Sequence, residues 1–330
     1  LPDIDIQHNW SISVEEATKI AIECEGAALN LDAKIVNSEG GNVNTNTAIR
    51  VYGNSHGFLR SYQKTNHSIG CVVVAGQENE KQRDYWYSSS RHPDDLEDHT
   101  QIGKKAGMRT LSRLGSKKID TTEAPVLFSP ELAGGFIGHA ISALSGSAQY
   151  RKTSFLLDAM GKQIFPDFFS IKERPHILKG MASRVFDAEG VATQDRNIVL
   201  NGIIEGYLLS AYSARRLNMS TTANAGGYHN LIIPGNADNQ KAIISSMQRG
   251  LLVQELIGQG VNNVTGDYSR GAAGYWIENG VIVHPVHEVT ISGNLIDLYK
   301  NILMIGHDYD ERSGIRCGAL LIDKLRISGN

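Results

Sequence analysis

Serine, histidine and cysteine side chains with active-site spacing are the first features to weigh. Residues 53–57 read GNSHG, the G-x-S-x-G pattern of a hydrolase nucleophile elbow, which requires a strand, a sharp turn and then a helix. The residues that follow, Phe58–Tyr62, have the composition of a strand instead. The sequence therefore predicts a hairpin turn around Ser55 rather than a nucleophile.

Histidines raise the question of a metal site. His284 and His287 have an H-x-x-H spacing, but on a strand side chains three residues apart point to opposite faces. His139 is predicted to lie on a helix, three residues after Phe136 and therefore at the border of the apolar face. This position has two interpretations: a half-buried histidine within the core, or the remnant of a metal site.

A zinc-peptidase helix would need more than His139. Such helices carry two histidine ligands and a glutamate beside the first, which activates a metal-bound water as general base. Here Ala140 stands where that glutamate would be. One helical ligand without a base does not support hydrolysis.

A glycine-dense run from Gly258 to Gly274 is the second candidate region. A loop of this composition lets another backbone approach closely and offers free N–H groups, which suits a bound peptide strand. Arg215 and Arg216 follow a predicted strand and add a basic pair. The alternative interpretation for both segments is a surface turn with solvated charges.

Composition excludes several classes of protein. The 330 residues carry 32 Lys and Arg against 35 Asp and Glu, so the net charge of −3 lacks the basic excess of a general nucleic-acid binder. The longest uncharged stretch, 132–150, is too rich in glycine and serine to span a membrane. Cys24, Cys71 and Cys317 are too scattered for a disulfide framework, and we expect buried thiols in a soluble cytoplasmic protein.

Local patterns predict the elements that position these residues. Helices are expected at Ser13–Asn30, which opens with a Ser-x-x-Glu capping box, at Asp95–Leu114, at 136–144 and at Asn239–Gln254. The dipeptides Asn201-Gly202 and Asn279-Gly280 predict type I′ hairpin turns. Further short strands are predicted at Ile49–Tyr52, Gly57–Tyr62, Ile69–Ala75, Asp84–Ser88, Pro125–Phe128, Ile302–Ile305 and Ala319–Ile322.

These elements predict an α+β fold of two domains, with antiparallel sheets, packed helices and a C-terminal domain rich in β-hairpins. The polar, basic stretch Gly115–Pro125 marks the expected boundary. The predicted domains are therefore 1–120 and 121–330.

Seven motifs together resemble the PmbA/TldD family, and within it the PmbA (TldE) branch. The resemblance extends over nearly the whole chain and implies a cytosolic zinc metallopeptidase complex of two homologous subunits. It also implies cleavage of unfolded or leader peptides, in peptide maturation and antitoxin degradation. The motifs are VYGNSHG at 51–57, YRKTS at 150–154, FDAEG at 186–190, YSARR at 212–216, GQG at 258–260, TGDYSRGAAG at 265–274 and RCG at 316–318.

The resemblance also assigns the metal site residue by residue. TldD-like subunits carry an H-E-x-x-x-H helix, and a later cysteine completes their zinc site. His139 matches the first histidine, Ala140 replaces the base, Leu144 replaces the second histidine, and Cys317 matches the metal-binding cysteine. This implies that no residue here is catalytic, that His139 and Cys317 are residual metal-site candidates, and that zinc belongs to a TldD-like partner.

The family begins further upstream, so residues 1–120 are expected to be the remainder of an N-terminal α/β domain whose natural start is absent, since residue 1 is Leu. Residues 121–330 would form the C-terminal metallopeptidase-like domain.

The function implied is that of a non-catalytic subunit that pairs with a TldD-like homologue, or with itself when alone, and completes the cleft for unfolded peptides. A metallopeptidase active alone with atypical ligands is the first alternative, and a non-proteolytic regulator of a protein such as gyrase is the second. Neither nucleic acid nor a membrane is expected as a partner. The candidate peptide or partner contacts are Arg215, Arg216, Asp267, Tyr268, Ser269, Arg270 and Gly271.

Overall fold

The computed structural model describes residues 2–77 and 80–329, and these form two compact units. The N-terminal unit comprises Ile4–Ser116 with Leu178–Met181, and the C-terminal unit comprises essentially Lys117–Ile177 and 182–329. Helices and mostly antiparallel sheets make up both units, which confirms the predicted α+β class.

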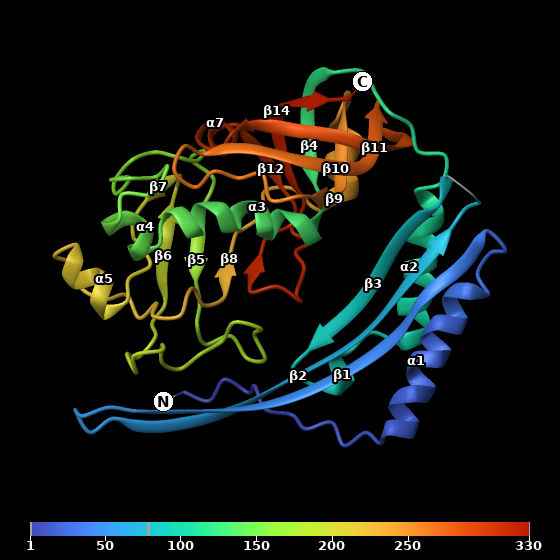
Figure 1. Ribbon diagram of the computed structural model, residues 1–330. Helices are drawn as coiled ribbons and strands as arrows, with labels where there is room; N and C mark the ends of the chain where they lie inside the picture. The colour runs from blue at the N-terminus through green and yellow to red at the C-terminus, as the bar shows by residue number, and fades with distance from the viewer. Residues whose placement is uncertain (1, 78–79, 330) are drawn as a thin grey trace. The chain divides into compact units, whose positions relative to one another are not determined.

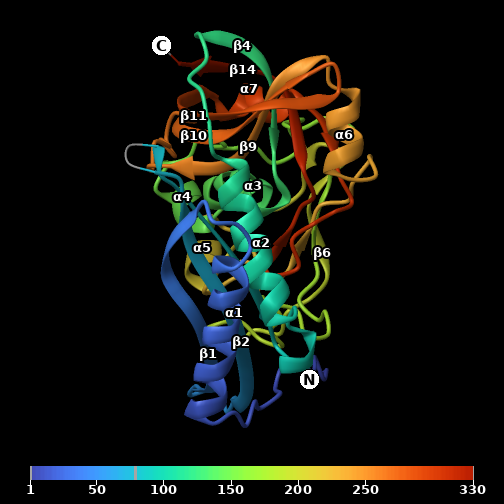
Figure 2. The same ribbon diagram turned by 90° about the vertical axis from the view of Figure 1, so that its right-hand side faces the viewer.

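The N-terminal unit is a three-stranded antiparallel sheet with two helices on one face (Figures 1 and 2). Its strands run in the order β1-β2-β3, and a short 3₁₀ turn, Pro93–Asp95, precedes the second helix. The two helices approach closely at Gly103, which has no side chain. A Cβ atom at this position would overlap the carbonyl oxygen of Cys24. The elements are α1 (Val14–Leu29), β1 (Ile35–Gly53), β2 (Leu59–Ala75), β3 (Gln82–Ser90) and α2 (His99–Ser112).

Two local predictions hold in this unit. The Ser13 side chain accepts a hydrogen bond from the Glu16 amide, and the Glu16 carboxylate accepts one from the Ser13 amide, so the capping box at the start of α1 is confirmed. Ser55 lies in the turn between β1 and β2, where the Asn54 amide donates to the Phe58 carbonyl at 2.9 Å. The hairpin interpretation of this segment is therefore confirmed.

β1 and β2 are longer than the short strands that we predicted. Between Asn42 and Thr47 the chain is rich in asparagine and threonine and gives little sign of a strand from composition alone. Pairing with β2 nevertheless continues through this segment, for example Val43 with Ile69 and Thr47 with Thr65. The cross-strand register therefore determines the length of these strands.

The main sheet of the C-terminal unit closes into a ring. The strands follow the order β11-β10-β9-β4-β14-β12, and β14 also pairs with β11, so β4, β9, β10, β11 and β14 form a closed circuit of hydrogen-bonded neighbours. β4 and β9 run parallel, and the other pairs are antiparallel. The strands are β4 (Thr122–Phe128), β9 (Arg249–Ile257), β10 (Asp267–Glu278), β11 (Val281–Asn294), β12 (Ile302–Ile305) and β14 (Leu320–Ser328).

A smaller sheet and short helices complete this unit. The smaller sheet has the order β13-β8-β5-β6-β7. Its strands are β5 (Ile171–Glu173), β6 (Arg196–Leu200), β7 (Ile203–Ile204), β8 (Leu231–Ile232) and β13 (Ile315–Arg316). The helices are α3 (Pro130–Ala143), α4 (Gly146–Tyr150), α5 (Ala211–Arg216), α6 (Gln240–Ser246) and α7 (Leu295–Lys300).

Helix α3 lies between the strand ring and the smaller sheet (Figure 1). Its Phe136 stacks on Phe128 of β4 with ring centroids 5.0 Å apart, and it meets Tyr268 and Tyr299 edge-on at 5.7 and 5.3 Å. On the other side the helix contacts β13. The apolar face of α3 is thus buried from both directions.

Both predicted type I′ turns are present. Asn201 and Gly202 have φ of 48° and 79°, and Asn279 and Gly280 have φ of 50° and 78°. Positive φ at both central residues defines this turn type. The hairpins β6–β7 and β10–β11 are therefore confirmed.

Two predictions for this unit are wrong. The helix expected over Asn239–Gln254 ends at Ser246, and β9 begins at Arg249, because pairing with β4 and β10 outweighs a helix-like apolar spacing. The glycine-dense segment is not one loop, since Asp267–Gly274 belongs to β10. A Cβ atom on Gly274 would overlap the Leu252 carbonyl oxygen, so the glycine serves strand packing.

Within the described ranges, no helix is long and apolar enough to cross a membrane.

We expect Gly274→Ala to lower the free energy of unfolding of the C-terminal unit by about 1–3 kcal/mol, because the added methyl group must push β9 away from β10. Urea titration followed by circular dichroism measures this. Gly135→Ala, at an exposed position on α3, is the control: its Cβ has open space, so helix propensity should raise stability by about 0.5–1 kcal/mol. Equal stability of Gly274→Ala and the parent chain would contradict the close approach.

Candidate functional site

Helix α3 places the motif residues in two different environments. Ser129 precedes the helix and Pro130 opens it, a favoured arrangement at a helix start. His139 is half-buried, as expected for a residue at the border of the apolar face. Ala140 and Leu144 are fully buried in the core of the C-terminal unit. The positions that the resemblance assigns to the base and the second ligand therefore lie in apolar packing.

Cys317 follows β13 and has no solvent exposure. Burial raises the pKa of its thiol, and the Asp308 carboxylate raises it further. Asp308 itself accepts hydrogen bonds from the amides of Gln240 at 2.7 Å and Ala319 at 3.2 Å. In the protein without metal, burial therefore favours the neutral thiol of Cys317.

The residues present do not fit a catalytic zinc ion. Helix α3 packs on the strand that leads to Cys317, since a Cβ atom on Gly134 would lie 2.9 Å from the Ile315 carbonyl oxygen. Yet across residues 2–77 and 80–329, no group of three His, Cys, Asp or Glu side chains is placed to hold a metal. The two candidate ligands are thus a half-buried imidazole and a fully buried thiol.

His139, Tyr268 and Arg270 form a cationic cluster beside α3. Tyr268 and Arg270 share one face of β10, and the Tyr268 ring meets the His139 ring edge-on, with centroids 6.0 Å apart. Burial lowers the pKa of His139, and the charge of Arg270 lowers it further. In the part of the chain that the structure describes, the buried Oη of Tyr268 and Nε of Arg270 have no hydrogen-bond partner. This cluster offers donors to an anion rather than ligands to a cation.

Asp267, Ser269 and Gly271 serve the strand framework. The Asp267 carboxylate accepts from Thr265 Oγ1 at 2.6 Å, and the Ser269 amide donates to the Gly260 carbonyl at 2.7 Å. Gly271 is paired with Ile257 on β9 and with β11 on the other side. Both edges of β10 are therefore occupied, and a peptide cannot be added as a strand along this segment.

We predicted that Arg215 and Arg216 follow a strand. The structure instead places them in the last turn of α5. Both side chains are exposed. The Arg216 guanidinium lies 5.8 Å from the centroid of the Tyr150 ring, and Tyr150 meets Tyr212 edge-on at 5.7 Å. Two tyrosines thus connect this basic pair with α4.

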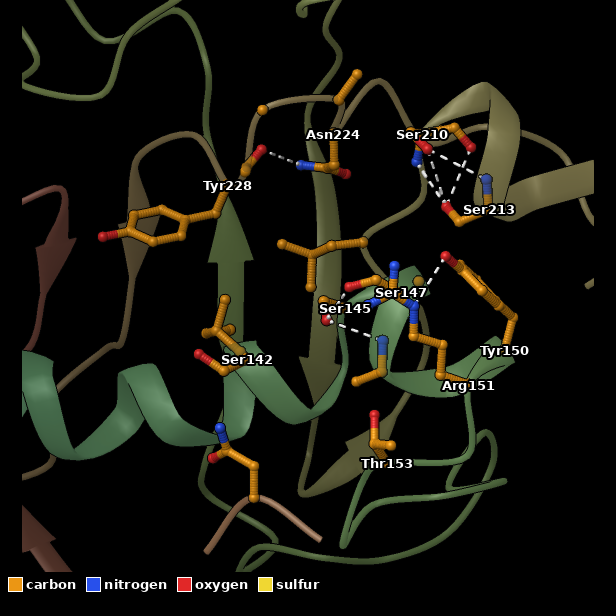
Figure 3. A pocket seen from close by; sticks show the side chains of 18 of the residues that line it. Ser142, Ser145, Ser147, Tyr150, Arg151, Thr153, Ser210, Ser213, Asn224 and Tyr228 are labelled. Atoms are coloured by element: carbon orange, nitrogen blue, oxygen red, sulfur yellow. Dashed lines mark hydrogen bonds between the residues drawn. The ribbon is translucent and has the colours of Figure 1, made fainter. Parts of the chain in front are cut away.

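A cavity of about 700 Å³ adjoins this group of aromatic and basic residues (Figure 3). Its walls are the C-terminal end of α3, α4, the start of α5 and the loops at 224–228 and 263–264. Sequence analysis missed this cavity, although the motif at 150–154 contributes three of its residues. The polar lining side chains are Ser142, Ser145, Ser147, Tyr150, Arg151, Thr153, Ser210, Tyr212, Ser213, Asn224, Tyr228 and Asn263.

Family models cover almost the entire chain. Residues 7–114 match the PmbA/TldA metallopeptidase central domain, and residues 121–329 match the C-terminal domain of the same family.

Individual relatives agree with the family models. A metalloprotease PmbA homolog from Haemophilus influenzae is 48% identical over 330 residues, which are 100% of this chain and 73% of the relative. Metalloprotease PmbA of Escherichia coli O157:H7 is 46% identical over 99% of this chain and 73% of its own. A crystal structure from Bacteroides thetaiotaomicron, described as a candidate modulator of DNA gyrase, has a TM-score of 0.95 at 29% identity, covering 100% of this chain and 75% of that one. The chain therefore belongs to the PmbA/TldD metallopeptidase family.

Proposed function

We propose that this chain is the non-catalytic, peptide-binding subunit of a cytoplasmic zinc metallopeptidase heteromer. The observation that carries the proposal is the burial of Ala140 and Leu144 at the positions of the general base and the second zinc ligand. A carboxylate or imidazole at either position would have to leave water and enter an apolar core. Catalysis is therefore assigned to a TldD-like partner that retains the complete motif.

Two further features support this division of roles. The charge of Arg270 acts on His139, and a fixed cation beside the one remaining helical ligand opposes the binding of Zn²⁺. Within residues 2–77 and 80–329, no third His, Cys, Asp or Glu side chain stands with His139 and Cys317 to complete a metal site. Zinc accordingly belongs to the partner subunit, and no cofactor is assigned to this chain.

The contribution of this chain is to hold the substrate and complete the cleft. Its relatives carry metalloprotease names, which supports a role in proteolysis. Unfolded or leader peptides are the proposed substrates, in peptide maturation and antitoxin degradation, and a homodimer is the proposed state without the partner. The proposed contact groups are the exposed side chains of Arg215 and Arg216 and the partly buried His139 and Arg270, whereas Tyr268 is 1% exposed and packs behind them.

A regulator of DNA gyrase is the second candidate function. The observation that favours it is the description of the Bacteroides homologue as a candidate gyrase modulator. It requires gyrase activity to change on addition of this chain alone, with no peptide cleaved.

The purified chain should contain far less than one zinc ion per molecule and leave an unfolded peptide intact. Mixing with an H-E-x-x-x-H homologue should give chelator-sensitive cleavage, because that subunit supplies the metal and the base. Metal analysis and a peptide-cleavage assay measure both. The control is the same homologue with the motif glutamate changed to glutamine, which should keep its zinc and lose cleavage. About one equivalent of zinc together with chelator-sensitive cleavage by this chain alone would refute the proposal.

Restoring the base by Ala140→Glu should create no activity. The position has no solvent exposure, so the new carboxylate enters the core, and the free energy of unfolding should fall by about 3 kcal/mol or more. Urea unfolding and the cleavage assay check this. Gly135→Glu, at an exposed position on the same helix with open space around it, is the matched control and should stay within about 0.5 kcal/mol. A stable, active Ala140→Glu chain would mean that only the base is missing.

A further inference from the structure

We propose that the 700 Å³ cavity beside α3, α4 and α5 binds an acidic segment of an unfolded peptide. This rests on the proposed function, because it names the class of substrate that the subunit would hold. The volume lies within the range of about 300–1,000 Å³ that is usual for ligand sites. The cavity is distinct from the cationic cluster beside α3, since neither His139 nor Arg270 lines it.

The lining of the cavity is polar, and its charge is positive. Among the described residues that line it, Arg151 is the one charged side chain, and no aspartate or glutamate is present. The remaining polar groups are mostly hydroxyls of serine, threonine and tyrosine, which both donate and accept hydrogen bonds. Such walls suit the alternating N–H and C=O groups of a peptide backbone, while the cation selects for carboxylates.

Two further arginines surround the cavity. Arg216 and Arg151 both lie over the Tyr150 ring, at 5.8 and 5.5 Å from its centroid. Arg184 donates to the carbonyl of Gly226, a lining residue, at 3.4 Å. Within residues 2–77 and 80–329, none of these three guanidinium groups forms an ion pair with a carboxylate. An anionic ligand would supply the missing partner.

Two acidic side chains, Asp187 and Glu189, hold segments of the cavity wall in place. Asp187 accepts from the amides of Glu189 and Val191 and, at 3.0 Å, from that of Ala225. Glu189 accepts from the amide of Ala211 at 2.7 Å, at the start of α5. These carboxylates are engaged with main-chain donors and form no ion pair with the arginines around the cavity.

The basic side of the cavity is preorganised. Nε of Arg151 donates to the Tyr150 hydroxyl at 3.1 Å, which holds the guanidinium against the ring, and Tyr212 packs against the same ring. Figure 3 shows Tyr150 and Arg151 together on one side and Tyr228 on the opposite side. Because these side chains are already ordered, less conformational entropy is lost when a ligand binds.

The test uses the full chain and two fluorescein-labelled unfolded peptides that differ only in several glutamates replaced by glutamines. Fluorescence anisotropy should give about tenfold tighter binding of the acidic peptide, and added salt should reduce the difference. The double variant Arg151→Gln/Arg216→Gln should weaken acidic-peptide binding about tenfold, and Arg151→Lys/Arg216→Lys should retain most of it. Arg326→Gln, which removes an exposed arginine on β14, is the control and should change binding less than about twofold.

Equal binding of the two peptides, or a double variant that binds like the parent, would overturn the inference. Unchanged thermal unfolding of the double variant shows that a loss of binding is not a loss of fold, since both arginines are exposed. A single-stranded oligonucleotide that competes better than the acidic peptide would also overturn it. Peptide binding needs no partner subunit, so a failure of cleavage in the mixed complex would refute the proposed function and leave this result intact.

Discussion

The closure of the strand ring through β14 is the constraint on which the C-terminal unit depends. β14 pairs with β4 along most of its length and with β11 near its end, for example Ile291 with Ile327. β4 stays paired with β14 on both sides of a register shift between Ile322 and Leu325, and on the other edge the partner of β14 changes there from β12 to β11. Within the ring, β10 lies between β9 and β11, and its Tyr268 packs edge-on against Phe136 and His139 of α3. Tyr268 and Arg270 share a face of the sheet because they are two residues apart on β10.

The position of α3 explains why two of its motif residues are buried. β4 leads directly into α3, and Phe128 and Phe136 stack to fix the helix between the ring and the smaller sheet. In that position Ala140 and Leu144 are core residues, and their apolar side chains contribute packing that a glutamate and a histidine would disrupt. The same packing therefore places both motif positions in one continuous core.

Much of the fold was predictable because its signals are local. A capping box and two Asn-Gly turns involve residues a few positions apart, and all three are present. The wrong predictions occur where pairing between strands that are distant in the sequence determines the secondary structure. The apolar spacing of 239–254 fits a helix, but β9 needs the residues after Ser246 as a strand between β4 and β10. Likewise, the sequence around Gly274 predicts a loop, whereas in the structure this glycine lies on a strand and packs against the Leu252 carbonyl.

The candidate sites were also hard to predict, because the residues that form them are far apart in the sequence. No pattern around His139 indicates that Tyr268 and Arg270 approach it, and none around Arg151 indicates that Arg216 shares the Tyr150 ring. Helix α3 connects the two regions: His139 belongs to the cationic cluster, while Gly138, Ser142 and nearby residues line the cavity. Substitutions at Ala140 and Leu144 alter the buried face of α3 and leave its cavity-lining residues unchanged. The buried face of α3 and its cavity-lining face can therefore vary independently of one another.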